Sequence, residues 1–186
     1  QKTEANQQFT RIIRQQYQKW IQDGTDMFFS HQAFGELVVP HVTNDTPTLL
    51  LMIDNLRFDQ WKIIQSALGP YYGLKAEKTY CSILPTATQY ARNAFFAGML
   101  PNEIKKTHPQ WWKDDTDAGG KNLFEDKLLS AQLSRLGLNW KHSYHKINKP
   151  EQGVKLAEQL NNELHNQLTI VVYNFVDRSE ERRVGK

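Results

Sequence analysis

The pattern of apolar positions along the chain predicts four strands. Leu49–Ile53 (LLLMI) has no polar alternation, which is typical of a parallel strand covered on both faces. A second strand is expected over Ala76–Leu84, and Leu168–Val176 (LTIVVYNFV) has the composition of another buried strand. Asn139–Ile147 (NWKHSYHKI) alternates, so successive side chains should point to opposite faces of a sheet.

Apolar residues at helical intervals predict five helices. The expected ranges are Asn6–Ile21, Asn55–Ala67, Ala87–Met99, Asn122–Leu136 and Glu151–Asn166. After the first helix, the predicted order of strands and helices is β-α-β-α-α-β-α-β. This order is typical of an α/β fold with a mainly parallel sheet flanked by helices.

The remaining segments suggest how the chain is divided. Residues 1–47 are expected to form a helical lead-in and linker, because Asp23–Pro47 mixes short apolar pieces with Gly, Asn and Pro. The α/β domain is then expected over residues 48–177. Pro101–Gly120 is expected to be irregular, as a solvated loop or a lid facing the substrate, and its acidic cluster lacks the later ligands of a calcium-binding loop.

Composition narrows the class of protein. The 186 residues are 39% hydrophobic and 11% aromatic, enough for one domain with a sizeable core. No run approaches the roughly 18 apolar residues of a membrane span, so no membrane insertion is expected. The single cysteine, Cys81, excludes internal disulfides and fits the reducing cytoplasm, and a packing role is expected for it. Gln1 in place of methionine suggests a start inside a longer polypeptide.

Asp54 is the first residue with candidate chemistry. It directly follows the strand Leu49–Ile53, and ligands of open α/β sheets bind beyond the carboxyl ends of the strands. A metal-binding role is therefore one interpretation. Capping of the following helix is an equally good interpretation from position alone.

A threonine hydroxyl at the start of the helix after Pro85 is the second candidate. Thr86 is placed where unpaired backbone N–H groups and the helix dipole would stabilise an alkoxide or a bound phosphate. Thr86 is therefore a candidate nucleophile, although threonine is also a common helix cap. Thr88 is the alternative cap or nucleophile within the same turn.

Other polar residues are weaker candidates. Arg92 and Asn93 lie further along the same helix and could approach a phosphate, although solvated helix positions are the more frequent outcome. His142 and His145 are three residues apart in a predicted strand. Their side chains should therefore point to opposite faces, which argues against a shared metal ion.

Several of these segments together resemble a known family. The stretches GELVVP, MIDNLRFDQW, SILPTATQYARNAFFAGMLP and VVYNFVD are similar to the PglZ domain of the alkaline phosphatase superfamily, especially as it occurs in response regulators of type IX secretion. The similarity extends over nearly the whole chain up to Asp177. It implies the amino-terminal part of an alkaline-phosphatase-like domain that is incomplete at its carboxyl end.

The resemblance also implies a function. A PglZ domain of this kind would be a phosphohydrolase with two zinc ions, in which Asp54 binds zinc, Thr86 is the metal-activated nucleophile and Asp177 begins a further ligand group. Phosphodiesters such as oligonucleotides would be the substrates, and signalling and secretion proteins the partners, with a homodimer possible. The alternative is a regulatory module of the same fold that works by binding, with the apolar stripe of Asn6–Ile21 as its docking or dimer surface.

The carboxyl-terminal nonapeptide Arg178–Lys186 (RSEERRVGK) breaks sharply from the preceding strand pattern. It equals the codon-by-codon translation of a common sequencing-adapter sequence, which suggests that natural sequence ends at Asp177. A family member would carry a histidine four residues after Asp177, where this chain has Glu181. The nonapeptide holds four of the 23 basic and two of the 20 acidic residues, so without it the net charge falls from +3 to +1. Charge alone therefore gives little support for nucleic-acid binding.

Sequencing the source locus across the Asp177 codon tests this hypothesis. The natural reading frame should continue with a histidine four residues after Asp177. Genomic DNA that encodes RSEERR at this position would rule out the adapter hypothesis.

Overall fold

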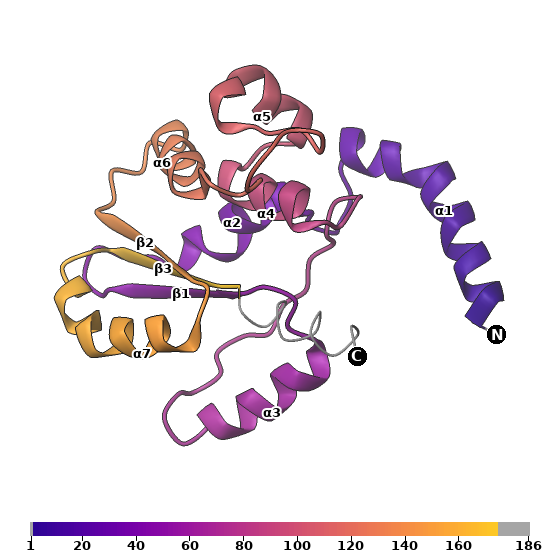
Figure 1. Cartoon of the computed structure of the whole chain (residues 1–186). Helices are drawn as coiled ribbons and strands as arrows, with labels where there is room; N and C mark the ends of the chain where they lie inside the picture. Colours follow the sequence, from indigo (N-terminus) through magenta and orange to yellow (C-terminus); the bar gives the residue numbers. More distant parts are fainter. Residues whose placement is uncertain (1, 175–186) are drawn as a thin grey trace.

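A three-stranded parallel sheet lies at the centre of the computed structural model, which describes residues 2–174 (Figure 1). Its strands are β1 (Thr48–Ile53), β2 (His142–Ile147) and β3 (Leu168–Tyr173), in the order β1-β3-β2. In register, Ile53 and Ile147 both lie opposite Tyr173. The three strands therefore end together, and the residues that follow them meet at one edge of the sheet.

Helices cover the two faces of the sheet unequally (Figure 1). Helices α2, α4 and α6 pack together over one face, and α7 lies on the other. The helices are α1 (Lys2–Asp23), α2 (Ser30–Leu37), α3 (Phe58–Leu68), α4 (Thr88–Ala97), α5 (Pro101–Thr107), α6 (Glu125–Arg135) and α7 (Pro150–Gln159), with short 3-10 turns at Val39–His41, Pro109–Trp111 and Leu160–Glu163. This arrangement confirms the predicted α/β fold.

The main core lies between the sheet and helices α2, α4 and α6. Alternate residues of β3 point to this side, and they pack against apolar residues at helical spacing on α6. The aromatic ring of Phe96 on α4 lies edge-on to Phe95 at 5.3 Å and to Tyr144 of β2 at 5.6 Å. Helix α4 ends at Gly98, whose φ of 59° is the left-handed conformation that favours glycine at a helix end.

A second, smaller cluster attaches the carboxyl end of α1. Tyr17 and Trp20 pack against Phe29 and Ile83 there, and the backbone N–H of Leu84 donates a 2.7 Å hydrogen bond to the Tyr17 hydroxyl. Cys81 also packs against this cluster, as predicted. The amino-terminal half of α1 extends away from the body of the protein and leaves Phe9 and Ile12 exposed (Figure 1). Only the carboxyl-terminal part of the predicted apolar stripe therefore packs against the rest of the described protein.

The strand predicted over Ala76–Leu84 is wrong. This segment forms a single bridge between Cys81 and Phe29, in which the backbone N–H of Cys81 donates to the carbonyl of Phe28 at 2.7 Å. Residues 76–80 are all exposed, so the apolar residues of this segment do not form one buried face. The sheet consequently has three strands within residues 2–174 rather than four.

Two segments predicted to be irregular contain helices. Helix α2 lies within the predicted linker and contributes the fully buried Ala33 and Phe34 to the core. Helix α5 begins at Pro101, because proline is well suited to the first turn of a helix as well as to the position after one. Both helices are short, so their apolar residues span too few turns to show a helical period.

Strand β1 is covered on one face rather than on both. Leu50 and Met52 pack against the main core, whereas Leu49 is 43% and Leu51 51% exposed. Within residues 2–174, α7 packs against β2 and leaves the corresponding side of β1 open. The prediction of burial on both faces was therefore wrong for this strand.

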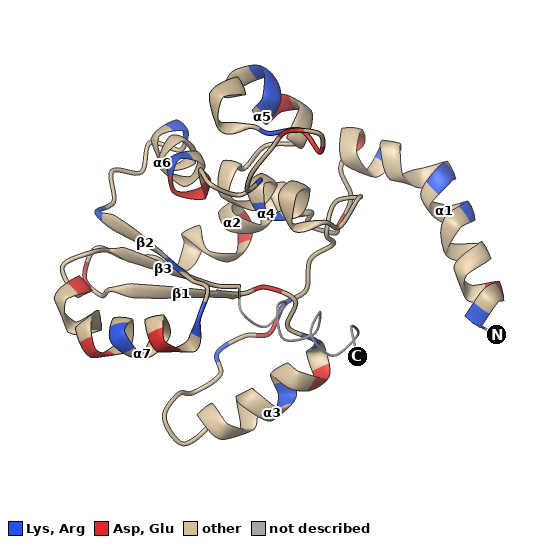
Figure 2. Ribbon diagram, in the orientation of Figure 1, with Lys and Arg blue, Asp and Glu red and all other residues tan. Residues whose placement is uncertain are grey.

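Charged residues are spread over the surface. Figure 2 shows basic and acidic residues interspersed along α3, α5, α6 and α7. This distribution agrees with the small net charge. Among residues 2–174, no helix combines the length and the apolar character needed to cross a bilayer.

Replacing Phe96 tests the packing of the main core. Phe96→Ala should lower the free energy of unfolding by about 3–5 kcal/mol, because the ring is fully buried and its removal leaves a cavity. Denaturant-induced unfolding measures the change. Phe9→Ala removes the same ring from an exposed position, and an equal loss in both variants would contradict the described core.

Candidate functional site

Polar residues follow all three strands at the carboxyl edge of the sheet. Asp54 follows β1, Asn148 follows β2 and Asn174 follows β3. The backbone N–H of Asp54 donates to the carbonyl of Tyr173 at 3.0 Å, and the Asn174 Nδ2 donates to the Asn148 Oδ1 at 3.2 Å. The three side chains therefore lie in one row where ligands of open α/β sheets bind.

The beginning of α4 faces this row. Helix α4 starts at Thr88, and the Thr88 hydroxyl donates to the Asp54 Oδ2 at 3.3 Å. Arg92 lies four residues later on the same face of the helix. Its Nη1 donates to the Asp54 Oδ2 at 3.0 Å and to the Asn174 Oδ1 at 2.6 Å. Arg92 therefore joins the ends of β1 and β3 to α4.

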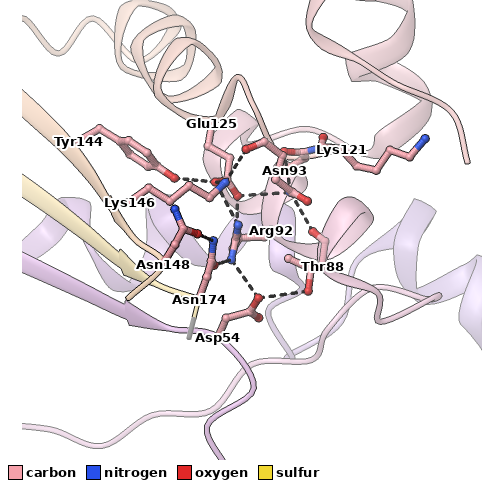
Figure 3. A network of polar contacts seen from close by, with 11 residues as sticks. Asp54, Thr88, Arg92, Asn93, Lys121, Glu125, Tyr144, Lys146, Asn148 and Asn174 are labelled. Carbon is pink, nitrogen blue, oxygen red and sulfur yellow. Dashed lines mark hydrogen bonds and ion pairs between the residues drawn. The ribbon is translucent and has the colours of Figure 1, made fainter. Parts of the chain in front are cut away.

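A buried carboxylate lies behind Arg92. Glu125 is the first residue of α6 and is 1% exposed. It accepts two hydrogen bonds from the Arg92 guanidinium, one from the Tyr144 hydroxyl at 2.5 Å, one from the Lys146 Nζ at 2.9 Å and one from the Asn122 Nδ2 at 3.3 Å (Figure 3). Two cations therefore share one carboxylate in the interior.

Two tyrosines lie within range of these charges. Burial, together with the Glu125 carboxylate, raises the pKa of the Tyr144 hydroxyl far above its usual range. Partial burial and then the Asp54 carboxylate also raise the pKa of Tyr80, although this residue is 45% exposed. The Tyr144 hydroxyl is therefore a hydrogen-bond donor to Glu125.

A cavity of about 520 Å³ opens in front of this network. Three cationic side chains and one carboxylate border it, together with amides that can donate hydrogen bonds. The lining residues are Asp54, Thr88, Arg92, Gly120, Lys121, Asn122, Leu123, Lys146, Asn148 and Asn174. With Glu125 counted as well, three positive charges face two negative ones, and the remaining positive charge favours an anionic ligand.

The structure separates the two candidate threonines. Thr88 contacts Asp54 and borders the cavity, whereas Thr86 is exposed and lies two residues before the first residue of α4. The interpretation of Thr86 as the nucleophile stays a prediction. Asp177, the third predicted metal ligand, lies outside the described residues.

Arg92 and Asn93 are not solvated helix residues, and that interpretation is wrong. Arg92 is 7% and Asn93 1% exposed, because α4 packs between α2 and α6. The Asn93 Nδ2 donates to the carbonyl of Lys121 at 3.1 Å, and its Oδ1 accepts from the Asn122 Nδ2 at 3.0 Å. Both side chains therefore belong to the polar network behind the cavity.

The described residues do not form a zinc site by themselves. No group of three or more His, Cys, Asp or Glu side chains is placed to hold a metal ion within residues 2–174. The Asp54 Oδ2 is engaged by Arg92 and Thr88. His142 lies 3.1 Å from the Ser130 hydroxyl, and His145 lies 3.4 Å from Glu163, so these two histidines do not share a ligand.

Sequence reasoning missed several residues of the site, among them Asn148, Asn174, Glu125 and Lys146. Asn148 and Asn174 directly follow strands, and the same position drew attention to Asp54. Asn174 was overlooked because the predicted strand Leu168–Val176 included it, whereas β3 ends at Tyr173. Glu125 and Lys146 carry no comparable signal. Their role follows from the packing of α6 against β2 and α4, which brings them together.

The fold and the site define an α/β domain with a polar, cation-rich cavity at the carboxyl edge of a parallel sheet. A comparison with family models identifies the particular kind of domain. Residues 33–186 match the PglZ alkaline phosphatase-like domain of the BREX system. The chain therefore belongs to the family of PglZ alkaline phosphatase-like domains. No protein among those with curated descriptions matches it.

Removing the charge of Glu125 tests the buried network. Glu125→Gln should lower the free energy of unfolding by about 3–5 kcal/mol, because Lys146 loses its carboxylate partner and Arg92 keeps only Asp54. Chemical denaturation measures the effect. Asp126→Asn makes the same change at the next, exposed residue of α6 and should leave stability nearly unchanged. Similar values for both variants would argue against the network.

Proposed function

We propose that this chain supplies the phosphate-binding side of a phosphohydrolase active site. The observation that carries the proposal is the row of Asp54, Asn148 and Asn174 beyond three parallel strands, facing the start of α4 across a cation-rich cavity. Phosphate esters are anions, and such a cavity offers them positive charge and N–H donors. Membership in an alkaline phosphatase-like family supports the same reaction class.

Thr88 is better placed than Thr86 to act as the nucleophile in this proposal. Its hydroxyl lies 3.3 Å from the Asp54 Oδ2, and Thr88 is the first residue of α4. An alkoxide formed there would be stabilised by Arg92 and by the amino end of the helix. Thr86, the residue favoured by the family resemblance, is within the same turn but exposed. Variants of both threonines separate the two assignments.

Two zinc ions, as the resemblance implies, would need ligands in addition to Asp54. Its Oδ1 accepts no hydrogen bond from residues 2–174, so this oxygen is available to a cation. Asp177 and a histidine four residues later would be the further ligands in a natural continuation. For the present chain we therefore expect weak binding of zinc and no turnover.

Hydrolysis of bis(p-nitrophenyl) phosphate by the naturally continued protein, with and without zinc, tests the proposed function. Turnover should require the metal, and Thr88→Ala should lower kcat by about a thousandfold or more, as expected for loss of a nucleophile. Asp54→Asn should lower both zinc content and kcat. Asp59→Asn, an exposed carboxylate on α3, serves as the matched control.

Other outcomes would revise or overturn the proposal. Loss of activity in Thr86→Ala but not in Thr88→Ala would show that Thr86 is the nucleophile. Unchanged turnover in Asp54→Asn would contradict a hydrolytic site at this edge. Robust turnover by the present chain would show that a histidine four residues after Asp177 is not required.

A second candidate function is a regulatory module that works by binding. It is favoured by the amino-terminal half of α1, where Phe9 and Ile12 are exposed on a helix that extends away from the body. In this version the longer protein would be a cytoplasmic response regulator similar to those of type IX secretion, with signalling and secretion proteins as partners. That version rests on the sequence motifs alone. Partner binding by metal-free protein would favour it over the enzyme.

A further inference from the structure

The cations that border the cavity differ in how many of their N–H groups already donate hydrogen bonds to other protein groups. Arg92, Lys121 and Lys146 all line the cavity. A guanidinium has five N–H donors and an ammonium has three. A bound anion requires a donor that still lacks an acceptor, so the donors of each side chain decide which cation can contact a ligand.

Arg92 is held on both sides by protein groups. Its Nε and Nη2 donate to Glu125, and its Nη1 donates to Asp54 and to Asn174. Four of its five donors are therefore engaged, and the side chain is 93% buried, with 7% exposed. Arg92 therefore positions Asp54, and its one remaining Nη2 N–H belongs to a side chain that is almost entirely buried.

Lys121 is committed to a loop. Its Nζ donates to the backbone carbonyls of Asp114, Asp115 and Asp117, which accounts for all three donors. Figure 3 shows its side chain pointing away from Arg92. Lys121 therefore holds the segment 114–117 in place and leaves no N–H for a ligand.

Lys146 retains a donor. Its Nζ donates to the carbonyl of Asn122 at 2.6 Å and to the Glu125 Oε2 at 2.9 Å, and its third N–H has no acceptor among residues 2–174. The side chain is 26% exposed. Asn148 follows the last residue of β2 and also lines the cavity, and its Nδ2 lacks an acceptor within the described part of the chain.

We propose that Lys146 and Asn148 form a subsite for the non-bridging oxygens of a phosphate group. This proposal rests on the proposed function and names the residues that contact the substrate anion. Glu125 positions the Lys146 ammonium at the cavity wall. Lys146 then supplies a charge-assisted hydrogen bond and Asn148 a neutral one. The row of strand ends places this subsite next to Asn174 and across from Asp54.

A titration of the present chain with inorganic phosphate, followed by ¹H–¹⁵N NMR, tests the subsite. Phosphate should shift the amide signals of residues 146–148 and Asn174 in a saturable way. Lys146→Met should raise the Kd by about tenfold or more, because it removes a charged hydrogen-bond donor. Lys141→Met, an exposed lysine before the amino end of the same strand, should leave the Kd within about twofold.

A second variant covers the case in which Lys146→Met fails to fold. Asn148→Asp keeps the oxygen that accepts from the Asn174 Nδ2 but places a negative charge in the cavity, so phosphate binding should be lost. Absence of saturable binding to the unmodified chain would overturn the subsite. The subsite would also be overturned if Asn148→Asp still bound phosphate. The same holds if Lys141→Met weakened phosphate binding as much as Lys146→Met. Failure of the proposed function would appear separately, as metal-independent turnover or unchanged turnover in Asp54→Asn of the continued protein.

Discussion

The site depends on one buried carboxylate, that of Glu125. An isolated charge in a protein interior is strongly unfavourable, and removal of one member of a buried ion pair leaves its partner uncompensated. Here two cations, Arg92 and Lys146, enter the interior together because Glu125 accepts hydrogen bonds from both. Arg92 then bonds Asp54 and Asn174. The relative positions of two strand ends and two helices therefore follow from this one ion network.

The parallel sheet explains why residues so distant in sequence meet. All three strands run in the same direction and end in register, so the residues after them lie side by side although they are numbered 54, 148 and 174. Helix α4 returns over the sheet and places its first turn at this edge. An alternation of strands and helices thus gathers polar groups at one edge while the apolar residues of β3 build the core on the face below α4.

The sequence predicted the parts of this arrangement that depend on local pattern. Asp54 was named as a candidate because it follows an apolar run, Thr88 as the alternative to Thr86 at a helix start, and Arg92 as a helix residue for which solvent exposure was the favoured prediction. Glu125 and Lys146 were not found, since a glutamate at a helix start and a lysine in a strand are ordinary surface residues until α6 and β2 bring them together. The strand predicted over Ala76–Leu84 failed for a related reason: its apolar content did not form a buried face.

The two cations that bond Glu125 have different physical tasks, and the choice of side chain fits each task. Arg92 must bond Glu125 on one side and Asp54 on the other, which the rigid, planar fork of a guanidinium does with several donors at once. Lys146 ends in a compact charge on a flexible stem, and that charge can adjust to a ligand while Glu125 holds it. A lysine in place of Arg92 has three donors on one nitrogen and could not make the four hydrogen bonds that Arg92 makes to Glu125, Asp54 and Asn174. The Glu125 carboxylate can therefore stabilise the ends of β1 and β3 through Arg92 and orient the charge of Lys146 toward a ligand.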